Sequence, residues 1–421
     1  MLSKIFKKIN IKRTFQHSQE SENVIVRGKK VFVGMSGGVD SSVSAALLID
    51  AGYDVTGVFI RTWQPDFIQC TWRDERRDAM RVCAHLGIPF LECDGESAYR
   101  DNVAMYMIEE YRAGSVPNPD VMCNREVKFG VLWAFAQAHG ADYIATGHYA
   151  QIQNLEVGLP SRTIGSPTSK LNPPQPSLIK EGAQRLKGID PAKDQSYFLW
   201  TLTSDDLAHT LFPVGHLPKT EVRKLAEKYN IPVATKKDSQ GVCFLGEIDM
   251  KEFLQHYIKT ENGNVLDTDG KTIGHHDGAL LYTLGERHGF TITEKTDHDK
   301  RYYVVAKDIP NNTITVSDSQ NETVGQSTHI PVIRPIWRSD ILNDELGVVP
   351  QGSAGGPTPG QSERISYTAN IRYHGENLPC KIEVKNETEA VIVFENPVLV
   401  APGQSIVVYD GEVCVGGGTV A

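Results

Sequence analysis

The chain has 421 residues, too many for one ordinary domain, and its 40% hydrophobic and 23% charged residues are typical of a globular protein. Its formal net charge of −9 argues against unselective attraction to nucleic acid, so an RNA partner would have to meet a local basic patch. Seven cysteines without a C-x-x-C pair indicate reduced thiols, and no apolar run approaches the roughly 20 residues that span a bilayer, so we expect no membrane association.

Residues 1–27 are expected to form a basic N-terminal extension. The first twenty contain five Lys or Arg residues and no acid before Glu20. The stretch is rich in Lys rather than Arg, has few serines and lacks a secretory apolar core. This composition favours an extension of a cytoplasmic protein, with a mitochondrial presequence as the alternative.

Short apolar runs alternate with segments of helical length between residues 29 and 148. The runs are 31–35, 54–60, 87–93 and 141–147, and each is followed by a glycine or a polar turn. This alternation predicts an α/β fold with a doubly wound parallel sheet. We assign it to a catalytic domain over residues 28–245, with a surface insertion at about 153–184 that is rich in Pro, Ser, Gly and Lys.

Helical patterns return over residues 219–260, and beyond Asn262 the chain changes to short alternating strands separated by turn residues. We expect a small central domain over 246–328 and a C-terminal β-barrel over 329–421, in which the segments IRYHG, CKIEVK, AVIVFE and SIVVYDGEV continue the strand pattern. His275 and His276 are interpreted as turn residues, so we predict no protein-held metal site.

The string VFVGMSGGVDSS joins an apolar run to a helical pattern through a Ser-Gly-Gly turn. Exposed amides at the positive end of a helix form an anion site. No lysine follows the glycines, so this is not a Walker loop. The string resembles the pyrophosphate loop of N-type ATP pyrophosphatases, which use ATP with Mg²⁺. The resemblance implies that ATP is bound by Gly34, Met35, Ser36, Gly37, Gly38, Val39, Asp40, Ser41, Ile60 and Gly147.

Two cysteines stand in reactive contexts. Asp120 precedes Cys123 by three residues, so a helix beginning there would place both on one face, and its N-terminus would favour a thiolate. An N-cap role is the alternative for Asp120. Cys243 follows two lysines and a flexible Ser-Gln-Gly turn, which are also electropositive surroundings. The remaining cysteines are expected to be core or surface residues: Cys70, Cys83, Cys93, Cys380 and Cys414.

The strings around these cysteines, 114–130 and 236–246, resemble the two cysteine motifs of bacterial and mitochondrial tRNA 2-thiouridylases. ATGHYA, DPAKDQSYFLW, YTLGERHGF, IRYHG and APGQSIVVYDGEVCVGGG resemble that family's other blocks in order. The resemblance implies an enzyme that adenylates the 2-carbonyl oxygen of the wobble uridine (position 34) of tRNA and replaces it with sulfur, releasing AMP and pyrophosphate. Cys243 would form the persulfide, Cys123 would be the nucleophile that resolves it, and Asp120 would be the acid or base.

The resemblance also implies the partners, which are the anticodon arm of tRNA and a sulfur-donor protein, either a cysteine desulfurase or a relay protein. The implied RNA contacts are Asn118, Pro119, Asp120, His148, Lys193, Asp194, Gln195, Arg372, Tyr373 and Gln404. The N-terminal tail and the insertions near 153–184 and 344–363 depart from the family pattern. One rival is another pyrophosphate-loop ligase or amidotransferase acting on a small molecule, which would not need two thiols; a non-catalytic RNA-binding protein is another.

Overall fold

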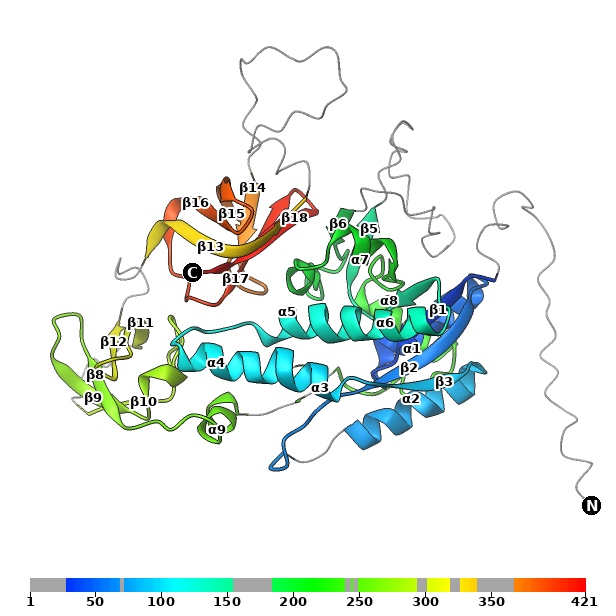
Figure 1. The fold of residues 1–421 in the computed structure, drawn as a ribbon, viewed down its shortest axis with the longest axis horizontal. Coiled ribbons are helices and arrows are strands. Elements are labelled where there is room, and N and C mark those ends of the chain that lie inside the picture. Colours follow the sequence, from blue (N-terminus) through cyan, green and yellow to red (C-terminus); the bar gives the residue numbers. More distant parts are fainter. Residues whose placement is uncertain are drawn as a thin grey trace, which may run out of the picture.

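The computed structural model describes residues 28–68, 72–153, 184–238, 243, 245, 249–293, 301–318, 326–338 and 367–421. The basic extension, Cys70, the segment near 344–363 and nearly all of the insertion at 153–184 lie outside these residues. Three sheets organise the described chain (Figure 1). Within the described residues, no helix is both long and apolar enough to cross a membrane.

The first sheet is parallel and has the strand order β3-β2-β1-β4-β7. Its register pairs Val31 with Val55 on one side and with Tyr143 on the other. The apolar runs of the sequence form four of its strands, as predicted. The bounds are β1 (Lys30–Gly34), β2 (Asp54–Arg61), β3 (Phe90–Asp94), β4 (Tyr143–Ala145) and β7 (Thr210–Leu211).

Helices cover both faces of this sheet, which confirms the doubly wound fold. Val31 and Val33 point to the face covered by α1 (Val39–Asp50), α2 (Trp72–Leu86) and α8 (Lys219–Lys228). Phe32 points to the opposite face, because successive side chains of a strand alternate. That face is covered by α3 (Glu96–Tyr99), η1 (Arg100–Met105), α4 (Tyr106–Arg112), α5 (Pro119–Cys123), η2 (Asn124–Val131) and α6 (Leu132–Ala138).

The second sheet has the order β10-β9-β8-β12-β11 and follows the short helix α9 (Met250–Gln255). His275 and His276 lie in β9, so their interpretation as turn residues is wrong. They pair with Thr291 and Phe290, and the alternation of the strand buries His276. The strands are β8 (Gly263–Leu266), β9 (Thr272–His276), β10 (Phe290–Ile292), β11 (Tyr303–Asp308) and β12 (Thr313–Ser317).

The C-terminal strands form the expected barrel. Their order is β13-β16-β15-β14-β17-β18, and a further pairing of β13 with β18 closes the sheet. The IRYHG segment is not a strand, because residues 371–375 form the turn after β14, where His374 has a φ of 54°. The strands are β13 (Ser327–Trp337), β14 (Tyr367–Asn370), β15 (Leu378–Asn386), β16 (Glu389–Val398), β17 (Ser405–Asp410) and β18 (Val413–Val420).

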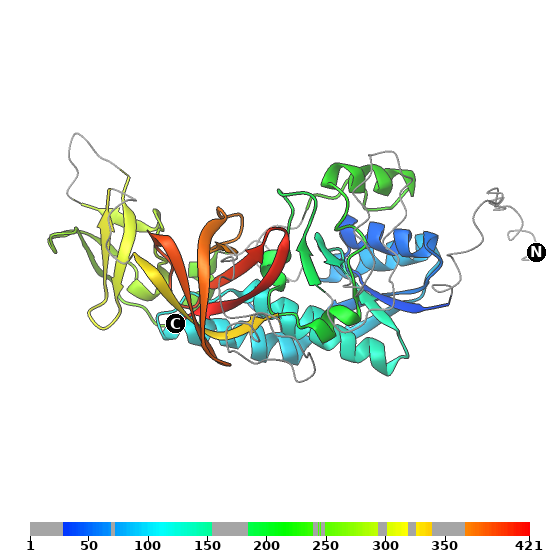
Figure 2. The ribbon, with the colours of Figure 1, turned by 90° about the horizontal axis from the view of Figure 1, so that it is seen from above.

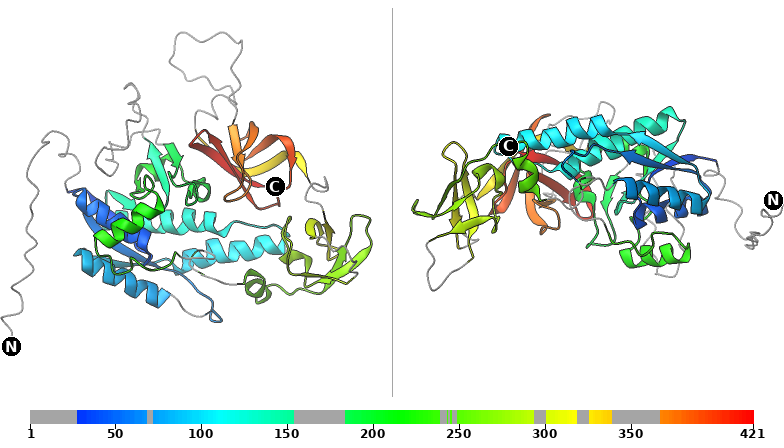
Figure 3. Two further views of the ribbon diagram at one scale, coloured as in Figure 1. Left: turned by 180° about the vertical axis from the view of Figure 1, so that it is seen from behind. Right: turned by 90° about the horizontal axis from the view of Figure 1, so that it is seen from below.

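The barrel is joined directly to the parallel-sheet region. β5 (Ala150–Gln153) and β6 (Gln184–Lys187) extend the barrel sheet through β18, where Val413 pairs with Leu186. Seen from above, the barrel strands lie between the central sheet and the parallel sheet (Figure 2). The helices α4, α5 and α6 run along the molecule beneath them (Figure 3). This arrangement brings the barrel next to the carboxyl ends of the parallel strands, where ligands bind in such sheets.

Candidate active site

The predicted phosphate loop connects β1 to the N-terminus of α1. Its hydroxyl groups stabilise the turn, since the Ser42 hydroxyl donates to the carbonyl of Gly38 at 2.6 Å. Two positions accept only glycine. A Cβ at Gly37, whose φ is 70°, would lie 2.4 Å from the carbonyl oxygen of Glu75, and a Cβ at Gly147 would lie 2.6 Å from the amide nitrogen of Ser41. The close approach of Gly147 to the first turn of α1 leaves no room for a side chain at this position.

Lysines reach this loop from distant parts of the chain. Lys219 Nζ lies 2.7 and 2.8 Å from the two carboxylate oxygens of Asp40, and the Tyr149 hydroxyl donates to one of them at 2.7 Å. Lys236 donates to the carbonyl of Gly37 at 3.1 Å. The loop itself contains no lysine, so these two lysines bring positive charge beside it. Lys219 could not be predicted from the sequence, because nothing local to the loop indicates it.

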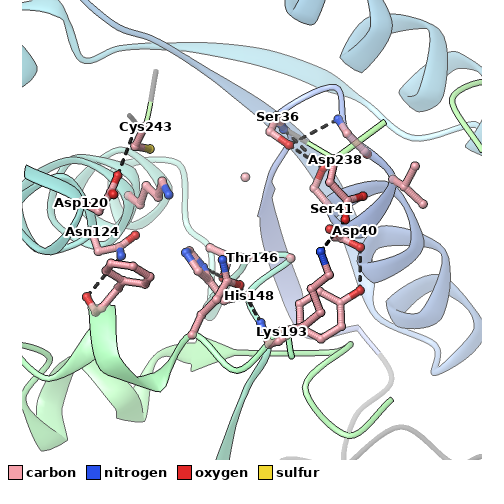
Figure 4. A pocket seen from close by; sticks show the side chains of 18 of the residues that line it. Ser36, Asp40, Ser41, Asp120, Asn124, Thr146, His148, Lys193, Asp238 and Cys243 are labelled. Atoms are coloured by element: carbon pink, nitrogen blue, oxygen red, sulfur yellow. Dashed lines mark hydrogen bonds and ion pairs between the residues drawn. The ribbon is translucent and has the colours of Figure 1, made fainter. Parts of the chain in front are cut away.

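A cavity of about 700 Å³ opens in front of the loop (Figure 4). Ser36, Asp40 and Ser41 lie on one side of it, and Asp120 and Cys243 lie on the other. Of the residues predicted to bind ATP, all but Gly37 line the cavity: Gly34, Met35, Ser36, Gly38, Val39, Asp40, Ser41, Ile60 and Gly147. The phosphate loop and one of the predicted cysteines therefore face the same space.

The two predicted cysteines, 120 residues apart in the sequence, are in contact. Cys123 Sγ lies 3.3 Å from Cys243 Sγ and donates a hydrogen bond to it. Cys123 is fully buried at the end of α5, whereas Cys243 is half-buried and lines the cavity. Two side chains hold the backbone of Cys243: Asp120 Oδ1 accepts from its amide at 3.1 Å, and the Tyr99 hydroxyl donates to its carbonyl at 2.7 Å.

The electrostatics of the thiols differ from expectation. Burial raises the pKa of Cys123 well above its usual value, so the prediction that a helix N-terminus favours its thiolate is wrong. The thiol lies at the fifth residue of α5, beyond the first turn where a helix dipole acts. The hydrogen bond from Cys123 and the charge of Lys128 lower the pKa of Cys243, against the effect of burial. The cation that lowers the pKa of Cys243 is thus Lys128. Lys236, one of the two lysines that precede Cys243 in the sequence, is instead bound to Asp78 at 2.8 Å.

Asp120 does not cap its helix. The N-cap is Asn118, whose side chain accepts from the amide of Val121 at 3.3 Å, so the alternative reading of Asp120 is wrong. Pro119 occupies the first turn, where its missing N–H costs nothing. Partial burial raises the pKa of Asp120, against the charge of Lys128 and the amide of Cys243. The carboxyl group therefore faces the cavity with a pKa closer to neutrality than that of an exposed aspartate.

Of the predicted RNA contacts between residues 148 and 195, three line the cavity: His148, Lys193 and Gln195. His148 is buried, its Nδ1 lies 2.7 Å from the Thr146 hydroxyl, and burial lowers its pKa well below the usual value. Lys193 lies 2.7 Å from Asp238. Asp194 instead accepts hydrogen bonds within its own loop, from the amide of Gly188 at 2.8 Å and from Ser196.

The barrel contributes Tyr373 to the cavity wall, where its ring centroid lies 4.4 Å from that of Phe198. Arg372 is exposed beside it and does not line the cavity. Gln404 also lies off the cavity and donates to the carbonyl of Val116 at 2.6 Å, which joins the barrel to the segment before α5. The lining residues that the sequence analysis missed include Asn124, Lys128, Tyr149, Phe198, Lys237 and Asp238.

The other described cysteines are buried and lie off the cavity. Burial raises the pKa of Cys83 and Cys93 to about 11 and that of Cys380 to about 12. Cys414 accepts a hydrogen bond from Arg185 at 3.3 Å. For Cys83, Cys93 and Cys380, burial therefore disfavours the ionised form.

Comparisons with known proteins cover almost the whole chain. Family models described as tRNA methyl transferase HUP domain, tRNA methyl transferase PRC-barrel domain and Aminomethyltransferase beta-barrel domain match residues 29–247, 251–318 and 354–420. The tRNA-specific 2-thiouridylase MnmA of Bacillus subtilis (strain 168) is 38% identical over 93% of this chain and 94% of its own length. The proteins of the same name from Pseudomonas fluorescens (strain SBW25) and Francisella philomiragia are 40% and 36% identical, over 93% and 94% of this chain and 94% and 100% of their own lengths. The chain therefore belongs to the family of the tRNA-specific 2-thiouridylases.

Proposed function

We propose that the protein is an ATP-dependent tRNA 2-thiouridylase that replaces the 2-oxygen of the wobble uridine, at position 34, with sulfur. The observation that carries the proposal is the single cavity that contains both a phosphate loop and a half-buried thiol, with a second thiol 3.3 Å behind the first. The relatives described above are named tRNA-specific 2-thiouridylases, which supports the proposal. A small-molecule ligase or amidotransferase would account for the loop but not for the paired thiols.

The first step activates the base. The uracil 2-carbonyl oxygen attacks the α-phosphorus of ATP, pyrophosphate leaves, and the proton on N3 is lost. The amides and hydroxyls of residues 36–41 would bind the pyrophosphate, with Lys219 and Lys236 nearby. The glycine at position 147 fits this role, because it lines the cavity and a Cβ there would press on the amide of Ser41.

We further propose that ATP binds as its magnesium complex. Among the described residues, no group of three or more His, Cys, Asp or Glu could hold a metal ion. Magnesium usually binds through substrate phosphates, water and one or two carboxylates, so no such group is needed. Asp40, which lines the cavity in the first turn of α1, is a carboxylate beside the loop and would exchange its contact with Lys219 for the metal.

The second step transfers sulfur. The Cys243 thiolate takes a sulfane sulfur from the donor, displacing the donor thiolate and becoming a persulfide. In one route the terminal sulfur attacks C2 and displaces AMP, and the Cys123 thiolate then attacks the Cys243 sulfur. In the other, Cys123 attacks first and releases sulfide, which itself displaces AMP. Both routes return a proton to N3 and end in a Cys123–Cys243 disulfide, which an external dithiol must reduce.

The accessibility of the two thiols supports this division of roles. Cys243 is a partly exposed residue that lines the cavity, whereas Cys123 is fully buried, so a donor protein would approach Cys243. The thiol of Cys123 stays protonated until it acts, because burial raises its pKa. Asp120, beside both sulfurs, is the group that would accept this proton or the N3 proton of the base.

We propose that the tRNA approaches between the barrel and the parallel-sheet region, with its target base unstacked into the cavity. Tyr373 and Phe198 offer aromatic faces there, and Lys193 offers a cation. The exposed Arg372 would contact phosphates outside the cavity. We also propose that Asn118, Pro119 and Gln404 act by positioning the segment that precedes Cys123.

One assay tests this proposal. Purified protein is incubated with unmodified tRNA, ATP, magnesium, cysteine, a cysteine desulfurase and a dithiol reductant, and the nucleosides are then analysed by mass spectrometry. We expect 2-thiouridine at position 34, with one AMP and one pyrophosphate released per thiolated base. ATP cleavage that depends on a small amine or amide acceptor, without thiolated tRNA, would instead establish the ligase alternative.

A further inference from the structure

We propose that Lys128 is a catalytic residue of sulfur transfer, whose ammonium group holds the Cys243 sulfur as an anion beside the carboxylate of Asp120. This inference rests on the proposed function and adds a residue to it. Lys128 lines the same cavity as Cys243 and Asp120 and forms a side-chain hydrogen bond with the Cys243 thiol. It therefore touches the atom that would receive and deliver the sulfur.

The local helix geometry explains how Lys128 reaches this position. α5 ends at Cys123, and the chain continues directly as the π-helix η2, which contains Lys128. Hydrogen bonds of a π-helix join residues five apart, so residues at this spacing lie close together. Lys128 follows Cys123 by five residues. In a regular α-helix the same spacing would turn the lysine to a different side of the helix.

The charges around Cys243 require a cation. The groups that face its sulfur or backbone are Cys123, Asp120, Lys128 and the hydroxyl of Tyr99. Without Lys128, an ionised Cys243 would share a partly buried site with the negative charge of Asp120, and like charges at such distances oppose ionisation. With Lys128 present, one cation offsets one of the two anions.

The hydrogen-bond directions agree with this assignment. Cys123 donates to the Cys243 sulfur, which is the arrangement expected when Cys243 is the anion and Cys123 the neutral thiol. Burial alone would lower the pKa of Lys128, but the two cysteines and Asp120 raise it, so the lysine stays protonated. The same charge lowers the pKa of His148, which burial has already lowered, so that ring is neutral and does not compete as the cation.

The test measures the ionisation of Cys243 directly and does not need turnover. The rate at which iodoacetamide alkylates Cys243 is followed from pH 6 to pH 10 by mass spectrometry of its peptide. Removing a nearby charge shifts a pKa by about one to three units, so Lys128→Met should raise the midpoint pH by at least about one unit. Alkylation at pH 7 should then slow roughly tenfold. Lys128→Gln, which keeps a polar group, gives the same result if Met disturbs folding.

Two further variants make the result specific. Lys128→Arg restores a cation and should bring the midpoint back toward that of the unmodified protein. Lys237→Met removes a different lysine from the wall of the same cavity and should leave the midpoint unchanged. An unchanged midpoint in both Lys128→Met and Lys128→Gln, or an equal shift in Lys237→Met, would overturn the proposal.

A second measurement separates this inference from the proposed function. Labelled sulfur is offered from a cysteine desulfurase, and persulfide on Cys243 is measured in the same variants. Lys128→Met should accept sulfur at least about tenfold more slowly at pH 7, and the difference should narrow as the pH rises. If the unmodified protein thiolates tRNA but Lys128 variants show neither defect, Lys128 is not catalytic. If Lys128→Met raises the midpoint pH of Cys243 alkylation and slows persulfide formation, but no tRNA is thiolated by the unmodified protein, the proposed function fails. The role of Lys128 in keeping the Cys243 sulfur ionised then still stands.

Discussion

The hydroxyl of Tyr99 should control how often Cys243 occupies the sulfur-transfer position. Tyr99 is fully buried and donates a 2.7 Å hydrogen bond to the carbonyl of Cys243. In Tyr99→Phe that carbonyl loses its donor, at a cost of about 1–1.5 kcal/mol to the arrangement in which the two sulfurs are in contact. This energy corresponds to a roughly five- to tenfold lower population of that arrangement. Sulfur transfer should slow by the same factor.

Single-turnover kinetics test this prediction. The enzyme is loaded with persulfide on Cys243 and mixed with ATP and tRNA, and 2-thiouridine and pyrophosphate are measured in the same quenched samples. Thiolation in Tyr99→Phe should slow roughly five- to tenfold, while pyrophosphate release stays unchanged because Tyr99 does not line the cavity. Tyr282→Phe is a matched control: Tyr282 is also fully buried, and its hydroxyl donates to the carbonyl of Gly289, outside the cavity. Unchanged thiolation in Tyr99→Phe, or an equal loss in Tyr282→Phe, would refute the reasoning.

Three other predictions concern Asp40 and Tyr373 in the cavity wall and the buried Lys307 outside it. Asp40→Asn removes the charge that Lys219 contacts, so tRNA-dependent pyrophosphate release should fall roughly 100-fold with tRNA affinity unchanged, and undiminished release would remove Asp40 from the ATP site. Tyr373→Ala removes an aromatic face worth about 1–3 kcal/mol per stacked base, so the Kd for tRNA, measured by filter binding, should rise roughly five- to 150-fold; an unchanged Kd would exclude stacking. Burial lowers the pKa of Lys307 to about 8. The unfolded chain then keeps the proton to higher pH than the folded protein, so stability relative to Lys307→Met should increase by about 2–3 kcal/mol as pH rises from 8 to 10.5. Denaturant unfolding with no such difference would contradict that assignment.

Local patterns predicted the parallel sheet and the phosphate loop correctly. The strands of that sheet are apolar runs bounded by turns, and the loop is one uninterrupted string between a strand and a helix. Both depend on interactions between neighbours in the sequence, so both can be recognised without tertiary contacts. The strands of the barrel were also predicted from alternating apolar residues, as in β15 and β16.

Contacts between residues far apart in the chain could not be predicted from the sequence. The pairing of Val413 with Leu186 joins the barrel to a segment more than 200 residues earlier, and nothing in either strand specifies the other. The contact of Lys219 with Asp40, 179 residues away in the sequence, could not be predicted for the same reason. Lys128 was not predicted because its approach to Cys243 depends on the π-helical turn of η2, which the sequence pattern does not indicate.

The central claim is that Cys243 carries the sulfur and Cys123 completes its transfer. Labelling with radioactive sulfur from a cysteine desulfurase tests it most directly, with label on each cysteine and 2-thiouridine yield measured on the same samples. Cys123→Ser should hold labelled persulfide on Cys243 but form no 2-thiouridine over repeated cycles. Cys243→Ser should acquire no label and form no product, while it still binds ATP and tRNA. Full activity of Cys243→Ser, or label found mainly on another cysteine, would contradict the account.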